Sequence, residues 1–182
     1  MSLRILVGLI VLVLFTQFQI ELNLLEVNIP VTGQTLAVLL VAYVLGLKEG
    51  TITILLYLII GLVGLPVFAD GGNGISAFTG NSGGYLIGFL FGGILTGFLS
   101  ERFRNTFVNS LLAAFSGTCV ILLFGVTRLA FNLGISDAVT YGFNPFVLGG
   151  IVKILIGGLL GWLIKKVVNR ISVNAVSVNN AD

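Results

Sequence analysis

The 182-residue chain contains no histidine and a single cysteine, and only 9% of its residues are charged. The absence of histidine excludes an imidazole base and any histidine-ligated metal. One cysteine, Cys119, excludes an internal disulfide framework, and its apolar surroundings indicate a small buried side chain. Soluble domains carry about a quarter charged residues, so this composition excludes a water-soluble fold and predicts an integral membrane protein.

Long apolar runs dominate what is present. A helix needs about 20 residues to cross about 30 Å of hydrocarbon, and by that measure two runs are short and are expected to tilt or to end in shielded non-helical backbone. The first run resembles a signal sequence but lacks a small-residue cleavage site, so we interpret it as a helix. The sequence therefore predicts an all-α bundle of six transmembrane helices. They are expected at residues 3–20, 33–47, 51–66, 84–100, 107–129 and 146–165.

Basic residues predict the orientation of this bundle. With a cytoplasmic N-terminus, the three external loops contain no Lys or Arg between their helices, which is a positive-inside pattern. Six helices then return the C-terminus to the cytoplasm. A single domain is expected at 1–170, followed by a short polar tail at 171–182 that is expected to be disordered. The location predicted is the plasma membrane, as a multi-pass protein. The basic residues on the cytoplasmic side are Arg4, Lys48, Arg102, Arg104, Lys165, Lys166 and Arg170.

Two basic residues, Arg128 and Lys153, fall in the outward half of the predicted membrane. A cation at such depth costs about 2.5–3.5 kcal/mol and usually faces a cavity or a partner. Either side chain can instead extend to the outer headgroups, and that alternative is stronger for Arg128. For Lys153 we favour a polar site that is reached from outside and suits an anionic or carbonyl-bearing ligand.

A glycine-rich insert at 66–84 follows the third apolar run. Its glycines favour a flexible or tightly turned backbone, whereas Phe68 and Phe78 would not be needed in a purely solvated loop. The insert is therefore predicted to be a lid over a small-molecule pocket. It also carries Asp70. It lacks the lysine and the strand context of a phosphate-binding loop, and nothing in the sequence predicts a nucleic-acid partner.

Further polar residues map to the same outer side. Thr32 and Gln34 begin the second apolar run, where they either cap a helix or point donors into a cavity. Tyr85 begins the fourth run and is either an interfacial anchor or a pocket residue. Asn144 precedes Pro145 as a turn and helix start, two turns above Lys153.

Glycines at four-residue spacing predict how the helices pack. Gly84, Gly88 and Gly92 form one such row, and Gly157 and Gly161 form another. This spacing allows close approach of helices. We favour packing inside the bundle, and the alternative is a docking face for a second membrane protein.

Four segments, PVTGQTLAVLL, GLPVFADGG, GNSGGYLIGF and FNPFVLGGIVKI, resemble the BioY family in order and spacing over about residues 5–165. That family comprises the biotin-capturing subunits (S components) of energy-coupling factor vitamin transporters. The resemblance implies a six-helix S-component fold without a cofactor. Biotin would enter from outside and lie beneath the loop between the first two helices and the loop between the third and fourth. Partners would be a transmembrane coupling subunit and two ATPases, since this chain has no nucleotide motif.

The sequence departs from the family pattern at the sixth helix. The family's F-x-P-G-D-x-x-K reads F-V-L-G-G-I-V-K here, so Lys153 is kept while Leu148 and Gly150 replace the proline and the acid. The resemblance makes that acid and lysine the polar contacts to the bicyclic head group. Asp70 or Asn144 are the candidates to compensate for the lost acid. The alternative function is uptake of a different small vitamin-like solute.

A cavity for biotin needs apolar walls and a few placed polar groups. We assign Lys153 and Asn144 to one polar end of the ligand, and Gln34, Thr32 and Tyr85 to the other. Phe68 and Phe78 would cover its apolar middle, with Arg128 and Asp70 as further candidates at the mouth.

Two other classes are less well supported. An intramembrane enzyme would need a catalytic pair at membrane depth, which this sequence lacks. A channel would usually show rings of charge, whereas a single deep lysine under a glycine-rich lid favours a closed pocket.

Overall fold

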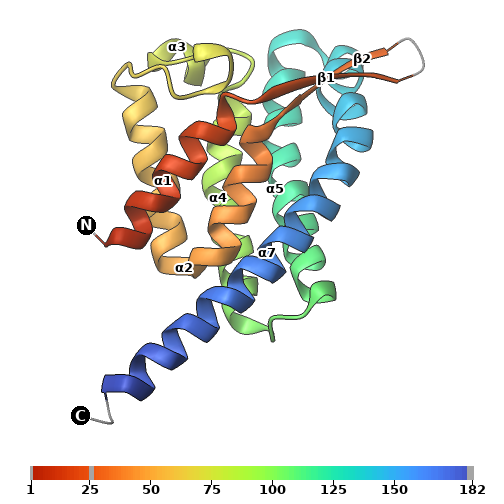
Figure 1. Ribbon diagram of the computed structural model, residues 1–182. Helices are drawn as coiled ribbons and strands as arrows, with labels where there is room; N and C mark the ends of the chain where they lie inside the picture. The colour runs from red at the N-terminus through yellow and green to blue at the C-terminus, as the bar shows by residue number, and fades with distance from the viewer. Residues whose placement is uncertain (1, 25–26, 180–182) are drawn as a thin grey trace.

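The computed structural model describes residues 2–24 and 27–179, without the side chains at 19–24, 27–32, 145–148 and 172–179. Helices form the body of the molecule and one antiparallel hairpin stands at its end (Figure 1). The elements in order are α1 (Leu3–Thr16), β1 (Gln19–Leu24), β2 (Val27–Thr32), α2 (Gly33–Leu62), the short 3₁₀ turn η1 (Ala69–Gly71), α3 (Gly74–Thr79), α4 (Gly83–Arg102), α5 (Phe107–Leu133), α6 (Ile135–Asp137), the π-helical turn η2 (Ala138–Phe143) and α7 (Asn144–Asn179).

Helix α2 consists of two arms that fold back on each other at Gly46 (Figure 1). Gly46 has a φ of 81°, a conformation that glycine adopts without the penalty of a side chain. The Glu101 carboxylate of α4 accepts a hydrogen bond of 2.9 Å from the Leu47 N–H, which begins the second arm. The arms, 33–45 and 47–62, correspond to the second and third predicted helices, but the turn lies at Gly46, a few residues before the expected position at 48–50.

Close glycine contacts hold α4 against α5. A Cβ on Gly88 would lie 2.9 Å from the Ile121 Cα, and one on Gly92 would lie 2.7 Å from the Gly117 carbonyl oxygen. Such contacts exclude any larger residue unless the backbones separate. The row at 84, 88 and 92 therefore packs two helices together within the bundle, which confirms the favoured interpretation.

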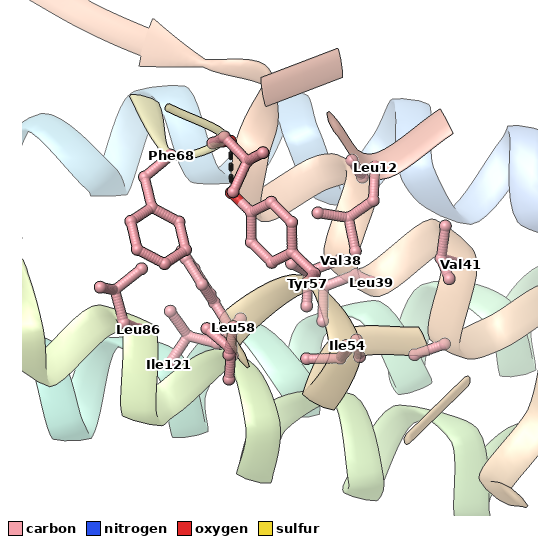
Figure 2. Packing of buried hydrophobic residues seen from close by; sticks show 14 residues of the cluster. Leu12, Val38, Leu39, Val41, Ile54, Tyr57, Leu58, Phe68, Leu86 and Ile121 are labelled. Carbon is pink, nitrogen blue, oxygen red and sulfur yellow. Dashed lines mark hydrogen bonds between the residues drawn. The ribbon is translucent and has the colours of Figure 1, made fainter. Parts of the chain in front are cut away.

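The core lies where α1, both arms of α2, α4 and α5 meet (Figure 2). Leu12, Val38, Ile54, Tyr57 and Ile121 are each 0% exposed. Large apolar side chains also cover much of the outer surface of the helices. A surface of this kind suits lipid rather than water.

Lys165 of α7 ties helix ends together at the end of the bundle away from the hairpin. Its Nζ donates hydrogen bonds to the Ser100 carbonyl oxygen of α4 at 2.7 Å and to the Tyr43 carbonyl oxygen of α2 at 3.3 Å. The ammonium also lies 5.0 Å from the centroid of the Tyr43 ring. A cation placed at the C-terminal ends of two helices complements their partial negative charge. We call this arrangement the Lys165 junction.

Two expectations from the sequence were wrong at local level. The first helix ends at Thr16, and the residues expected to complete it lead into a hairpin that adds strands to the predicted all-α fold. The alternation of polar and apolar residues from Gln19 to Leu24 is the sequence pattern that favours a strand here. Cys119 is exposed on α5 rather than buried.

Three described helices are long and apolar enough to cross a membrane: Gly33–Leu62, Gly83–Arg102 and Phe107–Leu133. The shorter helix Leu3–Thr16 is apolar as well. Helix α7 continues to Asn179 and so extends into the tail for which disorder was expected.

Candidate functional site

The insert at 66–84 crosses the end of the bundle that also carries the hairpin (Figure 1). It contains η1 and the six-residue helix α3, so it is more ordered than a plain glycine loop. We call the segment from Pro66 to Gly84 the lid. Asp70 has a φ of 56° in η1, and its side chain is exposed. The lid therefore has a defined shape that can enclose a space.

A cavity of about 180 Å³ lies under the lid. Gln34, Phe68 and Leu86 form its floor and wall, and none of its described lining residues is charged. Its volume is below the range of about 300–1,000 Å³ that is typical of ligand sites. A vitamin-sized molecule would therefore require the lid to lift. The lid side is lined by Ala69, Gly72, Ser76, Ala77, Gly80, Asn81 and Ser82.

Gln34 is held in place by Tyr57 of the second arm of α2. The Gln34 Nε2 donates a hydrogen bond of 2.7 Å to the Tyr57 hydroxyl, and the hydroxyl donates one of 3.1 Å to the Val67 carbonyl oxygen (dashed line in Figure 2). The Thr16 Oγ1 lies 3.3 Å from the same hydroxyl. Gln34 is 6% exposed and Tyr57 is fully buried. This network joins the end of α1, the start of α2 and the root of the lid.

Three aromatic rings connect the network to the lid. Phe68 packs edge-on against Tyr57 with centroids 5.3 Å apart, and Phe78 packs edge-on against Phe68 at 5.8 Å. Phe68 is 3% exposed and its ring lies over Gly61, where a Cβ would overlap it. Both predicted lid phenylalanines thus point inward, and Phe68 lines the cavity.

Arg128 and Asn132 of α5 hold the far side of the lid. The Arg128 guanidinium donates a hydrogen bond to the Thr79 carbonyl oxygen, and the Asn132 Nδ2 donates one of 3.1 Å to the Asn81 Oδ1. The Arg128 Nε is buried and has no hydrogen-bond partner among the described atoms. Arg128 therefore binds the protein's own lid and does not line the described cavity.

Tyr85 connects α4 to the segment before α7. Its hydroxyl donates a hydrogen bond of 3.0 Å to the Gly142 carbonyl oxygen of η2, and its ring lies over Gly125 of α5. Tyr85 is half-buried and does not line the lid cavity among the residues described there. Its position supports the helix ends around the mouth.

Lys153 of α7 is only 6% exposed. This burial disfavours the alternative in which the ammonium extends to the headgroups. Gly150 is also buried and lies one turn earlier, and no described atom lies within 4 Å of the place that a Cβ would occupy there. The helix therefore has free space beside Lys153. The described lining of the lid cavity does not include Lys153.

The remaining candidates are not gathered at this cavity. Asn144 is exposed at the start of α7, and Asp70 is exposed on the lid. The side chain of Thr32 lies outside the described part of the chain. The structure thus brings together Gln34 and Phe68 at the cavity, with Phe78 beside them.

A larger groove of about 610 Å³ runs between α1, the first arm of α2 and α7, and is almost wholly apolar. Arg4 is its single charged described lining residue, and Glu49 pairs with Arg4 at 3.1 Å. This groove offers little to a ligand that needs several hydrogen bonds. The lid cavity, with amide and hydroxyl groups around an aromatic wall, is chemically the better site for a small polar molecule with an apolar part.

Three residues of the site were not predicted from the sequence: Tyr57, Thr16 and Asn132. The first two look like ordinary members of apolar runs, and only the pairing of distant helices reveals their hydroxyl contacts. A tyrosine inside an apolar run is a usable signal, because its buried hydroxyl needs a partner.

Comparison with known proteins identifies the relatives of this chain. A model described as the BioY family matches residues 2–170. The "Biotin transporter BioY" of Thermotoga maritima is 37% identical over 139 residues, which cover 76% of this chain and 82% of that protein. The protein of the same description from Rhizobium etli is 34% identical over 168 residues, which cover 84% and 90%.

A solved structure has the same fold. It is the crystal structure of the S-component for biotin from an ECF-type ABC transporter, with a TM-score of 0.73 and 25% sequence identity. The match covers 90% of this chain and 88% of that chain.

Proposed function

Because the chain belongs to the BioY family, we propose that it takes up biotin across the cell membrane as the subunit that captures the substrate. Its relatives are named transporters, and the chain is a transport protein rather than an enzyme. The observation that carries the site assignment is the cavity under the lid, with Gln34 and Phe68 in its wall.

Biotin combines an apolar tail and a thioether ring with a ureido group and a carboxylate. In our proposal Phe68 and Phe78 cover the apolar part, and Gln34 hydrogen-bonds one polar end. Lys153 meets the other end once the lid lifts and the cavity enlarges toward α7. Asn144 and Thr32 line the widened mouth, while Arg128, Tyr85 and Asp70 act on the lid and the helix ends.

We propose further that the bundle crosses the plasma membrane six times, through α1, the two arms of α2, α4, α5 and α7. Residues 1–170 would form this single domain and 171–182 a short tail. The distribution of basic residues supports cytoplasmic termini. Arg4, which pairs with Glu49, and Lys165, which joins helix ends, both belong to the end of the bundle away from the lid. The lid and hairpin would then face the outside, where biotin is captured.

Energy for transport would come from partners. The solved structure with the same fold is the S-component of an ECF-type ABC transporter. By analogy we propose that this chain works with a transmembrane coupling subunit and two ATPases of the ABC type. Co-purification of the tagged chain with these subunits from its own cells tests this part.

Purification in mild detergent followed by mass spectrometry of the bound small molecules tests the function. We expect biotin to co-purify and isothermal titration to give saturable binding with one site. Absence of biotin binding in both measurements would contradict the proposal.

The free space beside Gly150 favours one second candidate. A ligand with a larger or differently charged head group than biotin fits a site that lacks the family's acid. Competition of labelled biotin with a panel of other vitamins separates the two candidates, since the true substrate displaces the label at the lowest concentration.

A further inference from the structure

The Tyr57 hydroxyl stands between the two segments that close the outer end of the bundle. One segment is the hairpin, which follows Gln17 at the end of α1, and the other is the lid, which begins beside Val67. The Val67 carbonyl oxygen accepts hydrogen bonds from the Tyr57 hydroxyl at 3.1 Å and from the Gln17 Nε2 at 3.4 Å. A single backbone oxygen thus joins the root of the lid to the base of the hairpin.

The same hydroxyl fixes the cavity wall. It accepts the 2.7 Å hydrogen bond from the Gln34 Nε2, and Gln34 lines the cavity. Tyr57 is fully buried and does not belong to the described lining. Any effect of the Tyr57 hydroxyl on a ligand must therefore pass through its hydrogen-bond partners, whereas the ring acts on the cavity wall through Phe68.

We infer that Tyr57 is a positioning residue that couples lid closure to the orientation of the Gln34 amide. The inference deepens the proposed function and rests on it. When the lid root is in place, the hydroxyl donates to Val67 and its lone pair faces Gln34. When the lid lifts, Val67 moves away, the hydroxyl is free to turn, and Gln34 loses its fixed partner.

Three features favour coupling over simple packing. A buried donor or acceptor without a partner is costly, so the hydroxyl, the amide and the carbonyl hold one another in a single arrangement. The Phe68 ring, which lines the cavity, packs edge-on against the Tyr57 ring at 5.3 Å. The Thr16 Oγ1 donates its one proton to the Leu12 carbonyl oxygen at 2.7 Å. It lies 3.3 Å from the Tyr57 hydroxyl, so it can accept from that hydroxyl when Val67 moves away but cannot replace the Gln34 amide as a donor.

The test is Tyr57→Phe in the full-length protein, with release of radiolabelled biotin measured in detergent. The ring and its packing remain and only the hydroxyl is lost. We expect dissociation about tenfold faster, in line with loss of one buried hydrogen-bonded group. Association should change less, because an open lid does not depend on the hydroxyl.

Tyr43→Phe is the matched control. Tyr43 lies on the first arm of α2, is 4% exposed and donates a hydrogen bond of 3.0 Å to the Asn105 Oδ1. The Tyr43→Phe variant loses a buried tyrosine hydroxyl far from the lid, so its melting temperature should fall while the rate of biotin release stays unchanged. Equal release rates in the two variants would overturn the inference.

Coupling to Gln34 is measured with Gln34→Ala alone and together with Tyr57→Phe. If Tyr57 acts through Gln34, the double variant releases biotin more slowly than the product of the two single effects predicts. Multiplicative effects would overturn the link to Gln34.

The position of the lid can be measured by cysteine labelling, and a purely structural role of Tyr57 would not change this measurement. In a Cys119→Ala background, Ala77→Cys on the inner side of the lid should be protected by biotin from maleimide labelling. Tyr57→Phe should weaken this protection and Tyr43→Phe should not. Undiminished protection in the Tyr57 variant would contradict the coupling.

Failure of the two proposals is distinguishable. If the parent chain does not bind biotin, the proposed function fails; if it binds and the Tyr57 variant behaves like the Tyr43 variant, only this inference fails. Should Tyr57→Phe not fold, Gln17→Ala removes the donor on the hairpin side from Val67. It is expected to release biotin several-fold faster, and an unchanged rate would overturn the inference.

Discussion

The guanidinium of Arg128 donates a hydrogen bond to the carbonyl oxygen of Thr79, at the C-terminal end of the lid helix α3. This contact ties α5 to the lid across 49 residues of sequence. Together with the bond between Asn132 and Asn81 it gives the lid a second attachment, separate from that at Val67.

Loss of this attachment is the first prediction. Arg128→Ala should increase the rate of biotin release several-fold with little effect on the fold, because only the far side of the lid is freed. Arg102→Ala, an exposed basic residue at the end of α4, is the control and should leave release unchanged. A chase experiment with labelled biotin measures both, and identical rates would contradict a role of Arg128 in holding the lid.

Lys153 carries the second prediction. Lys153→Ala should weaken biotin binding by about an order of magnitude or more, since a desolvated ammonium is a strong electrostatic partner. Lys153→Met, which keeps most of the side-chain volume, should show a similar loss if charge is the cause. Lys166→Ala on the exposed face of α7 is the control. Isothermal titration that returns unchanged affinity for both Lys153 variants would remove this residue from the site.

The space at Gly150 gives the third prediction. Gly150→Asp should be accommodated, because no described atom lies within 4 Å of the new Cβ. On a helix the carboxylate would face Lys153 one turn away, and it would accept hydrogen bonds from ureido N–H groups. We expect biotin affinity to rise several-fold in titrations. A fall in affinity for biotin, with a gain for another vitamin, would favour the second candidate function.

Helix packing gives the fourth prediction. Gly88→Val should lower the free energy of unfolding by about 1–3 kcal/mol, because the new side chain meets the Ile121 backbone at 2.9 Å. Ile87→Ala, on the outward face one residue earlier, should cost much less since Ile87 is 43% exposed. Thermal unfolding in detergent compares the two, and equal losses would mean that α4 and α5 can separate at little cost.

Much of the helical framework could be predicted from the sequence. The apolar runs at 84–100 and 107–129 correspond to α4 and α5, and a turn between the second and third runs is present, although it lies at Gly46 rather than at 48–50. The four BioY-like motifs predicted the family, which the comparisons confirm. Regular patterns of this kind are local, so they can be read without knowing what packs against them.

What the sequence did not predict depends on contacts between distant segments. Tyr57 lies in the run LLYLII, and nothing local indicates that its hydroxyl meets Gln34, 23 residues away. Arg128 was interpreted as a possible ligand contact because its partner is a backbone carbonyl of the lid, which has no sequence signature. The hairpin after Thr16 was not predicted because residues 3–20 together have about the length that a membrane-spanning helix needs, which hides the two-residue alternation that starts at Gln19. The ligand contacts of Lys153, Asn144 and Asp70 stay predictions.

The Lys165 junction lies at the end of the bundle opposite the lid, which we call the base, and it fixes the helix ends there to one another. At the base, the Lys165 ammonium joins the end of the first arm of α2 and the end of α4 to α7, whereas the lid is held at its far side by hydrogen bonds to short connecting segments. We therefore expect the lid end of the bundle to open more readily than the base. In the proposed orientation, release on the other side of the membrane would require either breaking the Lys165 contacts or a reorientation of the whole bundle in the bilayer.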